Sequence, residues 1–184
     1  MSKDKTYEPQ FKRRRLGKTD YRKRLGTVKG KTTRVVVRKT STQIIAHAVK
    51  FNLTGDTTLA YASSKDLKKF GFYGTNNTPS AYLTGYLLGK KMSEKKAILD
   101  IGRRSQSHGG VVFACLKGLL DAGIEIPHDK VALPSEDRIN GTVLEKYAKE
   151  NEKLFSNYEK NGIKVDSITK AFEKAKSEID KVKK

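Results

Sequence analysis

The sequence predicts an α/β fold: a small mixed β-sheet packed with helices, a basic extended N-terminal arm and a helical C-terminal region. Short runs rich in β-branched residues alternate with longer apolar segments that carry helix-capping signals. Basic residues crowd the start of the chain, and apolar residues recur at helical spacing near its end. We therefore divide the chain into an arm (1–32), an α/β domain (33–134) and a helical region (135–184).

Electric charge is the strongest compositional signal. The 184 residues include 39 Lys and Arg against 20 Asp and Glu, which gives a net charge of +19. The net charge is +12 over residues 1–40, +5 over 41–134 and +2 over 135–184. A compact body with such a surplus repels itself unless a polyanion neutralises it. The composition therefore predicts binding to nucleic acid or to an anionic membrane, chiefly through the arm.

Several classes of protein receive no support from the sequence. No apolar run approaches the roughly 20 residues needed to span a bilayer, and we expect no secretory signal in the first ten residues. Cys115 is the only cysteine and forms no intramolecular disulfide, which fits a reducing compartment. Three histidines and no CxxC pair predict no metal site. We expect no cofactor, no small-molecule substrate and no membrane partner.

The arm is predicted to be extended except for one short helix. The segment 19–22 carries a capping signal for that helix, and Gly26 and Gly30 are expected to break it. The four consecutive basic residues at 12–15 are typical of a disordered tail or a localisation signal. Here basic residues recur as far as position 39, which favours binding along a nucleic-acid backbone.

The first predicted strand covers residues 33–40, because three successive valines favour an extended backbone. Further strands are predicted over 42–49 and 57–62, and the short connections indicate an antiparallel meander. Side chains alternate along a strand, so Val35 and Val37 are expected in the core.

The opposite face of this first strand carries Arg34 and Arg38 and is predicted to bind RNA. The two residues lie roughly 13 Å apart at about 3.3 Å per residue, so they would engage separate points along a backbone. The alternative pairs them with acidic residues of the chain itself. We favour the RNA contact because the strand over 42–49 has no carboxylate to offer.

A helix is predicted from Thr78 to about Lys91. Thr78 and Pro79 are typical of an N-cap and a first helical residue. Gly85 and Gly89 lie on one side of this helix, where they favour close packing on a sheet.

A buried strand is predicted over 97–101, followed by an apolar helix over 109–122 that Gly123 ends. The loop between them leads into a helix N-terminus, which attracts phosphate. The loop lacks the residue spacing of nucleotide-binding loops, and its two arginines suit RNA phosphate better than a mononucleotide. The alternative is a solvated basic turn.

A second loop, residues 71–78, precedes the first long helix. Phe72 and Tyr73 are candidates for stacking on an unpaired base, and Asn76 and Asn77 could read base edges or cap the helix. The alternative is that the two aromatic residues pack locally.

The C-terminal region is predicted to be helical, with breaks near Gly141 and Gly162. Its last helix carries an apolar seam at alternating spacings of three and four, formed by Val165, Ile168, Phe172, Ala175, Ile179 and Val182. The seam either packs on the chain's own domain or docks on a partner, and the sequence favours neither.

Two other functions fit parts of the sequence. Asp100 and Asp121 lie on a predicted strand and the following helix, where two carboxylates could hold the metal of a nuclease. The alternative is that the first caps a strand and the second faces water. No catalytic triad stands out among the few His and Cys residues. A basic module that binds a partner without RNA is the other possibility.

Five segments, in order, resemble the universal family of large-subunit ribosomal proteins numbered eighteen, in its archaeal form. They are 19–25 in the arm, 34–38 in the first strand, 74–82, 119–123 and 134–141. The segment 74–82, GTNNTPSAY, is the most specific of them. The resemblance covers nearly the whole chain, and the loop 103–109 departs from the family's pattern.

The resemblance implies an α/β domain with a small mixed sheet and a basic N-terminal extension, without enzymatic activity. It implies binding to 5S rRNA, contacts with the large rRNA and with neighbouring large-subunit proteins, including the one numbered five, and a place in the central protuberance of the cytoplasmic ribosome. It also implies an archaeal source, because the longer C-terminal region of eukaryotic relatives does not follow here.

The predicted rRNA-binding residues lie on the arm, on the first strand and in the two loops. They are Lys12, Arg13, Arg14, Arg15, Lys18, Tyr21, Arg22, Lys23, Arg24, Lys29, Lys31, Arg34, Arg38, Lys39, Phe72, Tyr73, Asn76, Asn77, Arg103, Arg104 and His108.

Overall fold

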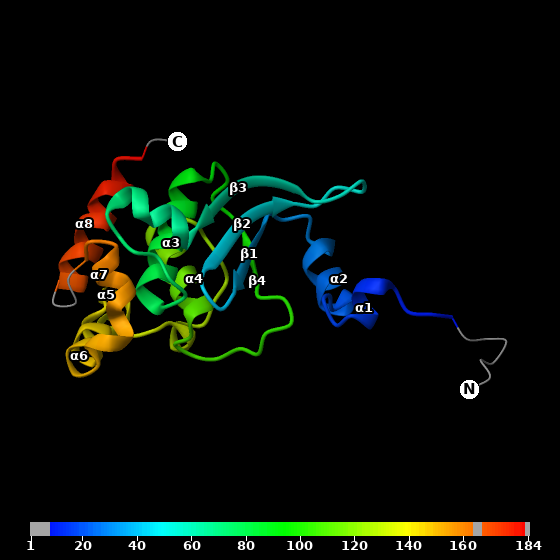
Figure 1. Cartoon of the computed structure of the whole chain (residues 1–184). Coiled ribbons are helices and arrows are strands. Elements are labelled where there is room, and N and C mark those ends of the chain that lie inside the picture. The colour runs from blue at the N-terminus through cyan, green and yellow to red at the C-terminus, as the bar shows by residue number, and fades with distance from the viewer. Residues whose placement is uncertain (1–7, 164–166, 183–184) are drawn as a thin grey trace, which may run out of the picture.

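A four-stranded mixed sheet lies at the centre of the molecule (Figure 1). The computed structural model describes residues 8–163 and 167–182. The strands are β1 (Arg34–Lys39), β2 (Ile44–Lys50), β3 (Thr57–Ser63) and β4 (Ile98–Asp100), in the order β3-β2-β1-β4. The first three pair antiparallel, which confirms the predicted meander, whereas β4 runs parallel to β1.

Strand β4 is shorter and less buried than predicted. Its three residues are only half-buried, because β4 lies at an edge of the sheet. Beyond it, within the described residues, one isolated parallel bridge joins Lys96 to Glu125.

Two helices, α3 (Thr78–Lys91) and α4 (Val111–Asp121), cover one face of the sheet. Val35 and Val37 of β1 point into the core between the layers and are fully buried, as predicted. The 3-10 helix η1 (Ser64–Phe70) connects β3 to the loop before α3.

Glycines allow α3 and α4 to approach each other closely. A Cβ at Gly85 would overlap the backbone of Cys115, and a Cβ at Gly118 would overlap the backbone of Tyr82. The expectation that Gly85 packs on a sheet is therefore wrong, because its neighbour is the second helix.

The start of α3 and the end of α4 follow simple capping chemistry. The N-cap of α3 is Asn77 rather than Thr78, and the Asn77 Oδ1 accepts a hydrogen bond from the Ser80 amide at 3.0 Å. Pro79 lies in the first turn, as predicted. Gly123 follows α4 with a φ of +90°, a left-handed conformation that glycine adopts without strain.

The C-terminal region is helical, as predicted. A short 3-10 turn η2 (Lys130–Ala132) leads into α5 (Glu136–Asn140), α6 (Thr142–Glu150), η3 (Glu152–Phe155), α7 (Ser156–Lys160) and α8 (Ile168–Asp180). Gly141 separates α5 from α6, and Gly162 follows α7.

The apolar seam of α8 packs on the chain's own domain. Four seam residues are buried: Ile168, Phe172, Ala175 and Ile179. The Phe172 ring lies 5.5 Å from the ring of Tyr82 on α3. Val182 is half-buried, and Val165 lies outside the described residues. The α8 seam and the sheet belong to one apolar core, so the three-part division of the chain stays a proposal about its folding units.

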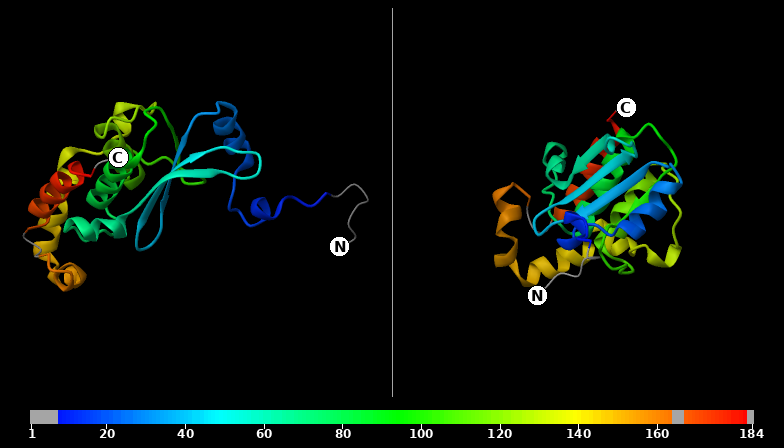
Figure 2. Two further views of the ribbon diagram at one scale, coloured as in Figure 1. Left: turned by 90° about the horizontal axis from the view of Figure 1, so that it is seen from above. Right: turned by 90° about the vertical axis from the view of Figure 1, so that its right-hand side faces the viewer.

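The arm contains two helices, α1 (Lys12–Arg15) and α2 (Tyr21–Lys29), where one was predicted. Gly30 ends α2, but Gly26 lies inside it, because one glycine costs a helix only about 1 kcal/mol. The arm and the C-terminal helices lie at opposite ends of the molecule (Figures 1 and 2). Within the described ranges, no helix is long and apolar enough to cross a bilayer.

Candidate nucleic-acid interface

The arm displays its basic side chains to solvent. The carboxylate of Asp20 caps α2 by accepting hydrogen bonds from the amides of Arg22 and Lys23 at 3.1 and 3.2 Å. Neither arm helix buries a residue of its own. The cap therefore starts a helix whose basic face is left open.

Most of these basic side chains have no acidic partner within the described part of the chain. The exposed ones without an ion pair are Lys12, Arg13, Arg14, Arg15, Lys18, Arg22, Lys23, Lys29 and Lys31. Tyr21 is exposed beside them, with its ring 5.6 Å from that of Phe11. This surface can neutralise a polyanion, because its positive charges are not paired with carboxylates of the described residues.

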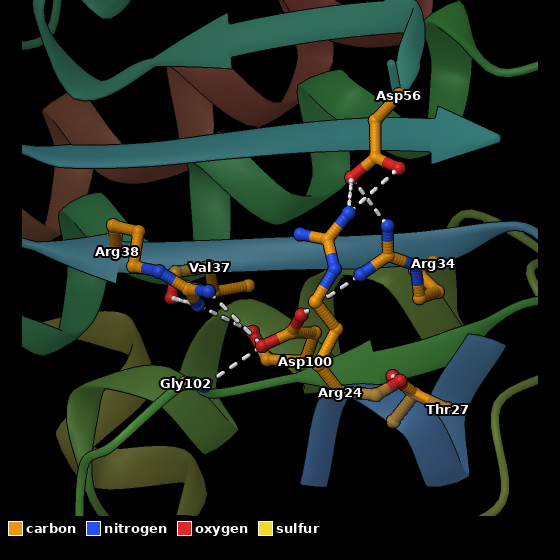
Figure 3. A network of polar contacts seen from close by, with 8 residues as sticks. All are labelled: Arg24, Thr27, Arg34, Val37, Arg38, Asp56, Asp100 and Gly102. Atoms are coloured by element: carbon orange, nitrogen blue, oxygen red, sulfur yellow. Dashed lines mark hydrogen bonds and ion pairs between the residues drawn. The ribbon is translucent and has the colours of Figure 1, made fainter. Parts of the chain in front are cut away.

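The arginine face of β1 differs from its prediction (Figure 3). Arg34 is 2% exposed, and its guanidinium bonds to Asp56 at 2.6 Å and to Asp100 at 3.4 Å. Arg38 bonds to the other oxygen of Asp100 at 3.0 Å. The expectation that these arginines lack acidic partners is wrong. The carboxylates come from the β2–β3 connection and the end of β4, rather than from the neighbouring strand.

Arg34 is therefore part of the fold and is unavailable to RNA in this conformation. Its Nε is buried and has no hydrogen-bond partner among the described residues. A buried charge of this kind depends strongly on its counter-ions. Arg38 is partly open, with 41% of its side chain exposed, and it shares the Asp100 carboxylate with Arg34.

The same network joins the arm to the sheet. Arg24 of α2 bonds to both carboxylate oxygens of Asp56 at 3.1 Å, and Asp56 also holds Arg34. Figure 3 shows these side chains together on the face of the sheet opposite α3 and α4, with α2 on the same side as the network. Arg24 thus has a structural partner, unlike most of the arm's basic residues.

His47 lies on this open face, where its ring makes an edge contact with Tyr61 at 5.1 Å. Burial lowers the pKa of His47, and the positive charge of Arg38 lowers it further. Both effects favour the neutral form of the imidazole.

The loop between β4 and α4 carries three of the predicted contacts. Arg103 donates to the carbonyl of Gly17 in the arm, and Arg104 donates to the carbonyl of Lys39 at 2.6 Å. Both arginines are exposed and neither forms an ion pair among the described residues. His108 is exposed in the same loop. Carbonyl bonds leave a guanidinium charged, so this loop keeps its positive potential.

The two aromatic residues of the loop before α3 pack against the chain itself and are not exposed for contact with a base. Phe72 is 1% exposed and belongs to the core, so its predicted stacking on a base is wrong. Tyr73 is half-buried, with its ring 5.2 Å from that of Tyr158. Local packing, the alternative interpretation, accounts for both aromatic residues.

The two asparagines of that loop are also engaged. Asn76 donates to the carbonyl of Thr40 at 3.2 Å, and Asn77 donates to the hydroxyl of Tyr158 at 2.6 Å while capping α3. Of the two roles considered for Asn77, helix capping is the one that the structure shows.

The two carboxylates considered for a nuclease lie in separate surroundings. Asp100 is engaged by Arg34, Arg38 and the Gly102 amide. Asp121 accepts a hydrogen bond from Tyr82 at 2.8 Å and pairs with a lysine of its own helix. Among the described residues, no group of three or more metal-ligating side chains forms. Nothing in this geometry favours a nuclease.

Two residues of this region, Asp56 and Gly17, were not predicted from the sequence to take part. Asp56 lies in the β2–β3 connection directly before β3, 22 residues after Arg34, and no local pattern linked the two residues. Gly17 adopts a left-handed φ of +63° and presents its carbonyl to Arg103. Both residues act across long sequence separations, which local patterns do not encode.

Comparison with known proteins identifies the family. Residues 5–98 match the model of "Ribosomal large subunit proteins 60S L5, and 50S L18". Large ribosomal subunit protein uL18 of Korarchaeum cryptofilum is 45% identical over 94% of both chains. The proteins of that name from Methanosphaera stadtmanae and Methanothermobacter thermautotrophicus are 45% and 42% identical over 98% of both chains. The chain therefore belongs to the uL18 family of large ribosomal subunit proteins, and it is a structural ribosomal protein rather than an enzyme.

Proposed function

We propose that this chain binds 5S rRNA and anchors it to the large rRNA in the central protuberance of the large subunit. The observation that carries the proposal is the exposed basic surface of the arm, whose side chains lack acidic partners in the described part of the chain. Family membership supports a ribosomal RNA as the polyanion. Contacts with neighbouring proteins, including the one numbered five, belong to the same proposal.

The structure narrows the residues proposed for this contact. We retain the exposed residues of the arm, together with Arg103, Arg104 and His108 of the β4–α4 loop. Arg34 and Phe72 are left out because they are buried. Arg24 and Arg38 are secondary, because each already pairs with a carboxylate of the chain.

The direct test is to purify the tagged chain from an archaeal host and to sequence the RNA that accompanies it. We expect strong enrichment of 5S rRNA. A matched variant with Arg13, Arg14 and Arg15 changed to Gln should lose most of that RNA while keeping its fold. Purification free of RNA, or with unselected RNA, would refute the proposal.

The strength of binding should also depend steeply on salt. If six to ten phosphates are neutralised, affinity for a 5S rRNA transcript should fall about a thousandfold or more between 50 and 200 mM salt, by analogy with duplex DNA. A salt titration measures this slope directly. An affinity that stayed flat across the range would contradict backbone neutralisation by the arm.

A further inference from the structure

The arm is fastened to the body at two separate points. Arg24 of α2 holds Asp56 beside the sheet, and Arg103 of the β4–α4 loop holds the carbonyl of Gly17 between the two arm helices. A third bond, from Arg13 Nε to the Thr19 hydroxyl at 2.9 Å, closes the turn around Gly17. The described part of the arm therefore has a defined position against the body although neither of its helices buries a residue.

A cleft of about 500 Å³ lies between these two fastenings. One wall comes from the arm and the other from the end of β1, from β4 and from the loop after β4. Six cationic side chains line it: Arg13, Lys18, Lys23, Arg24, Arg38 and Arg103. The arrangement could not be foreseen from the sequence, because the lysines and the opposite wall lie about 80 residues apart.

The two carboxylates in the cleft are already engaged. Asp20 caps α2, and Asp100 accepts bonds from Arg34, Arg38 and Gly102. Lys18 and Lys23, by contrast, have no ion pair or hydrogen bond to their ammonium groups within the described residues. The cleft thus keeps a net positive charge, and cationic side chains lie on both of its walls.

We propose that this cleft binds the sugar–phosphate backbone of a single RNA strand, with Lys18 and Lys23 on successive phosphates. The proposal rests on the RNA-binding function above and names the part of the surface where the strand enters. A space of this size suits one or two nucleotides, not the full width of a double helix. No aromatic residue lines the cleft, so no base is expected to stack on an aromatic ring there, and we assign the cationic side chains to phosphate contacts.

The test compares two pairs of lysines that carry the same charge. In the full chain, Lys18→Gln with Lys23→Gln removes the cleft pair. Lys29→Gln with Lys31→Gln removes an exposed pair of the same arm that does not line the cleft. Affinity for a 5S rRNA transcript is measured for the parent and both variants over a range of salt.

We expect the cleft pair to weaken binding about 100-fold, because charge-assisted bonds contribute roughly tenfold or more each. Its salt slope should fall by about two phosphate equivalents. The control pair should weaken binding less than about tenfold. Equal weakening by the two pairs would overturn the cleft and leave 5S rRNA binding in place, whereas a parent that bound no 5S rRNA would overturn the proposed function itself.

A footprint on the unmodified protein gives an independent measurement. Acetylation by a water-soluble reagent should modify Lys18 and Lys23 readily in the free chain and at least tenfold more slowly in the RNA complex. Lys29 and Lys31 should be protected less. Equal reactivity of Lys18 and Lys23 in the free and bound protein would overturn the proposal, whatever the variants do.

Discussion

Helices α2 and α8 are both short, lysine-rich and joined to the same body, yet different forces hold them. Helix α8 buries four residues in the core, whereas α2 buries none and is held by an ion pair through Arg24. The charge of α8 is balanced and that of α2 is strongly positive. Apolar burial fixes a helix in any solvent condition in which the core survives, whereas ion pairs in contact with water weaken with salt. The α8 end of the molecule is thus held by packing, whereas the α2 end keeps its positive charges exposed.

The largest expected effect lies at the α8 end. Phe172→Ala removes a buried ring that contacts Tyr82 and should lower the free energy of unfolding by about 3–5 kcal/mol. Denaturant unfolding of the free chain measures this loss. Phe11→Ala, the matched control, removes a ring that is 74% exposed in the arm and should change the free energy by less than about 0.5 kcal/mol. Similar losses of stability for the two variants would mean that α8 is not held by apolar burial more strongly than the arm.

The network around Arg34 should show the next largest effect. Asp100→Asn keeps the shape of the side chain but removes the charge that faces Arg34 and Arg38. We expect a loss of about 2–3 kcal/mol, because a buried guanidinium is left partly uncompensated. The control Glu125→Gln removes an exposed carboxylate that pairs with Lys96 at 3.9 Å and should cost less than about 0.5 kcal/mol. If Asp100→Asn were equally mild, Arg34 would not depend on Asp100, and Asp56 at 2.6 Å would be sufficient as its counter-ion.

The arm itself should open more readily than α8. In the free chain, limited proteolysis should cut between Lys12 and Lys31 before it cuts within α8, since opening the arm exposes no core. Raising the salt concentration should speed cutting in the arm and leave α8 unchanged, because screening weakens Arg24–Asp56. Equal resistance of the two segments to proteolysis would mean that α2 is held as firmly as α8.

The smallest effect concerns Asp180, the last residue of α8, which pairs with Lys90 at 2.7 Å. Hydrogen bonds from Lys90 and Tyr86 lower the pKa of Asp180. A carboxylate with a depressed pKa stabilises the fold above its unfolded pKa, and this contribution is lost as the pH falls through the lower folded value. Asp180→Asn should therefore flatten the dependence of stability on pH below about pH 4.

The expected size is less than about 1 kcal/mol, the range of solvent-exposed pairs. Glu178→Gln, which removes the partner of Lys181, is the matched control on the same helix. Acid unfolding curves of the three proteins provide the measurement. An unchanged curve for Asp180→Asn would mean that the Asp180–Lys90 ion pair does not help to hold α8.

Much of this architecture followed from local sequence patterns. The meander, the helix from Thr78 to Lys91, the end of α4 at Gly123 and the apolar seam of α8 were all predicted. Each depends on residues that are neighbours in sequence, through side-chain alternation, capping or helical spacing. The uneven charge likewise predicted which end of the chain carries the basic surface.

The tertiary structure alone decided which basic residues are free. Arg34 meets Asp56 and Asp100, which lie 22 and 66 residues further along the chain. Strand pairing and the hairpin connection bring these charges together, and no local pattern encodes that approach. The burial of Phe72 likewise depends on the packed core rather than on its neighbours in sequence. Local sequence patterns predict the helices, the strands and the sign of the surface charge. Which charges pair with one another, and which stay exposed to a nucleic acid, depends on how the fold brings distant segments together.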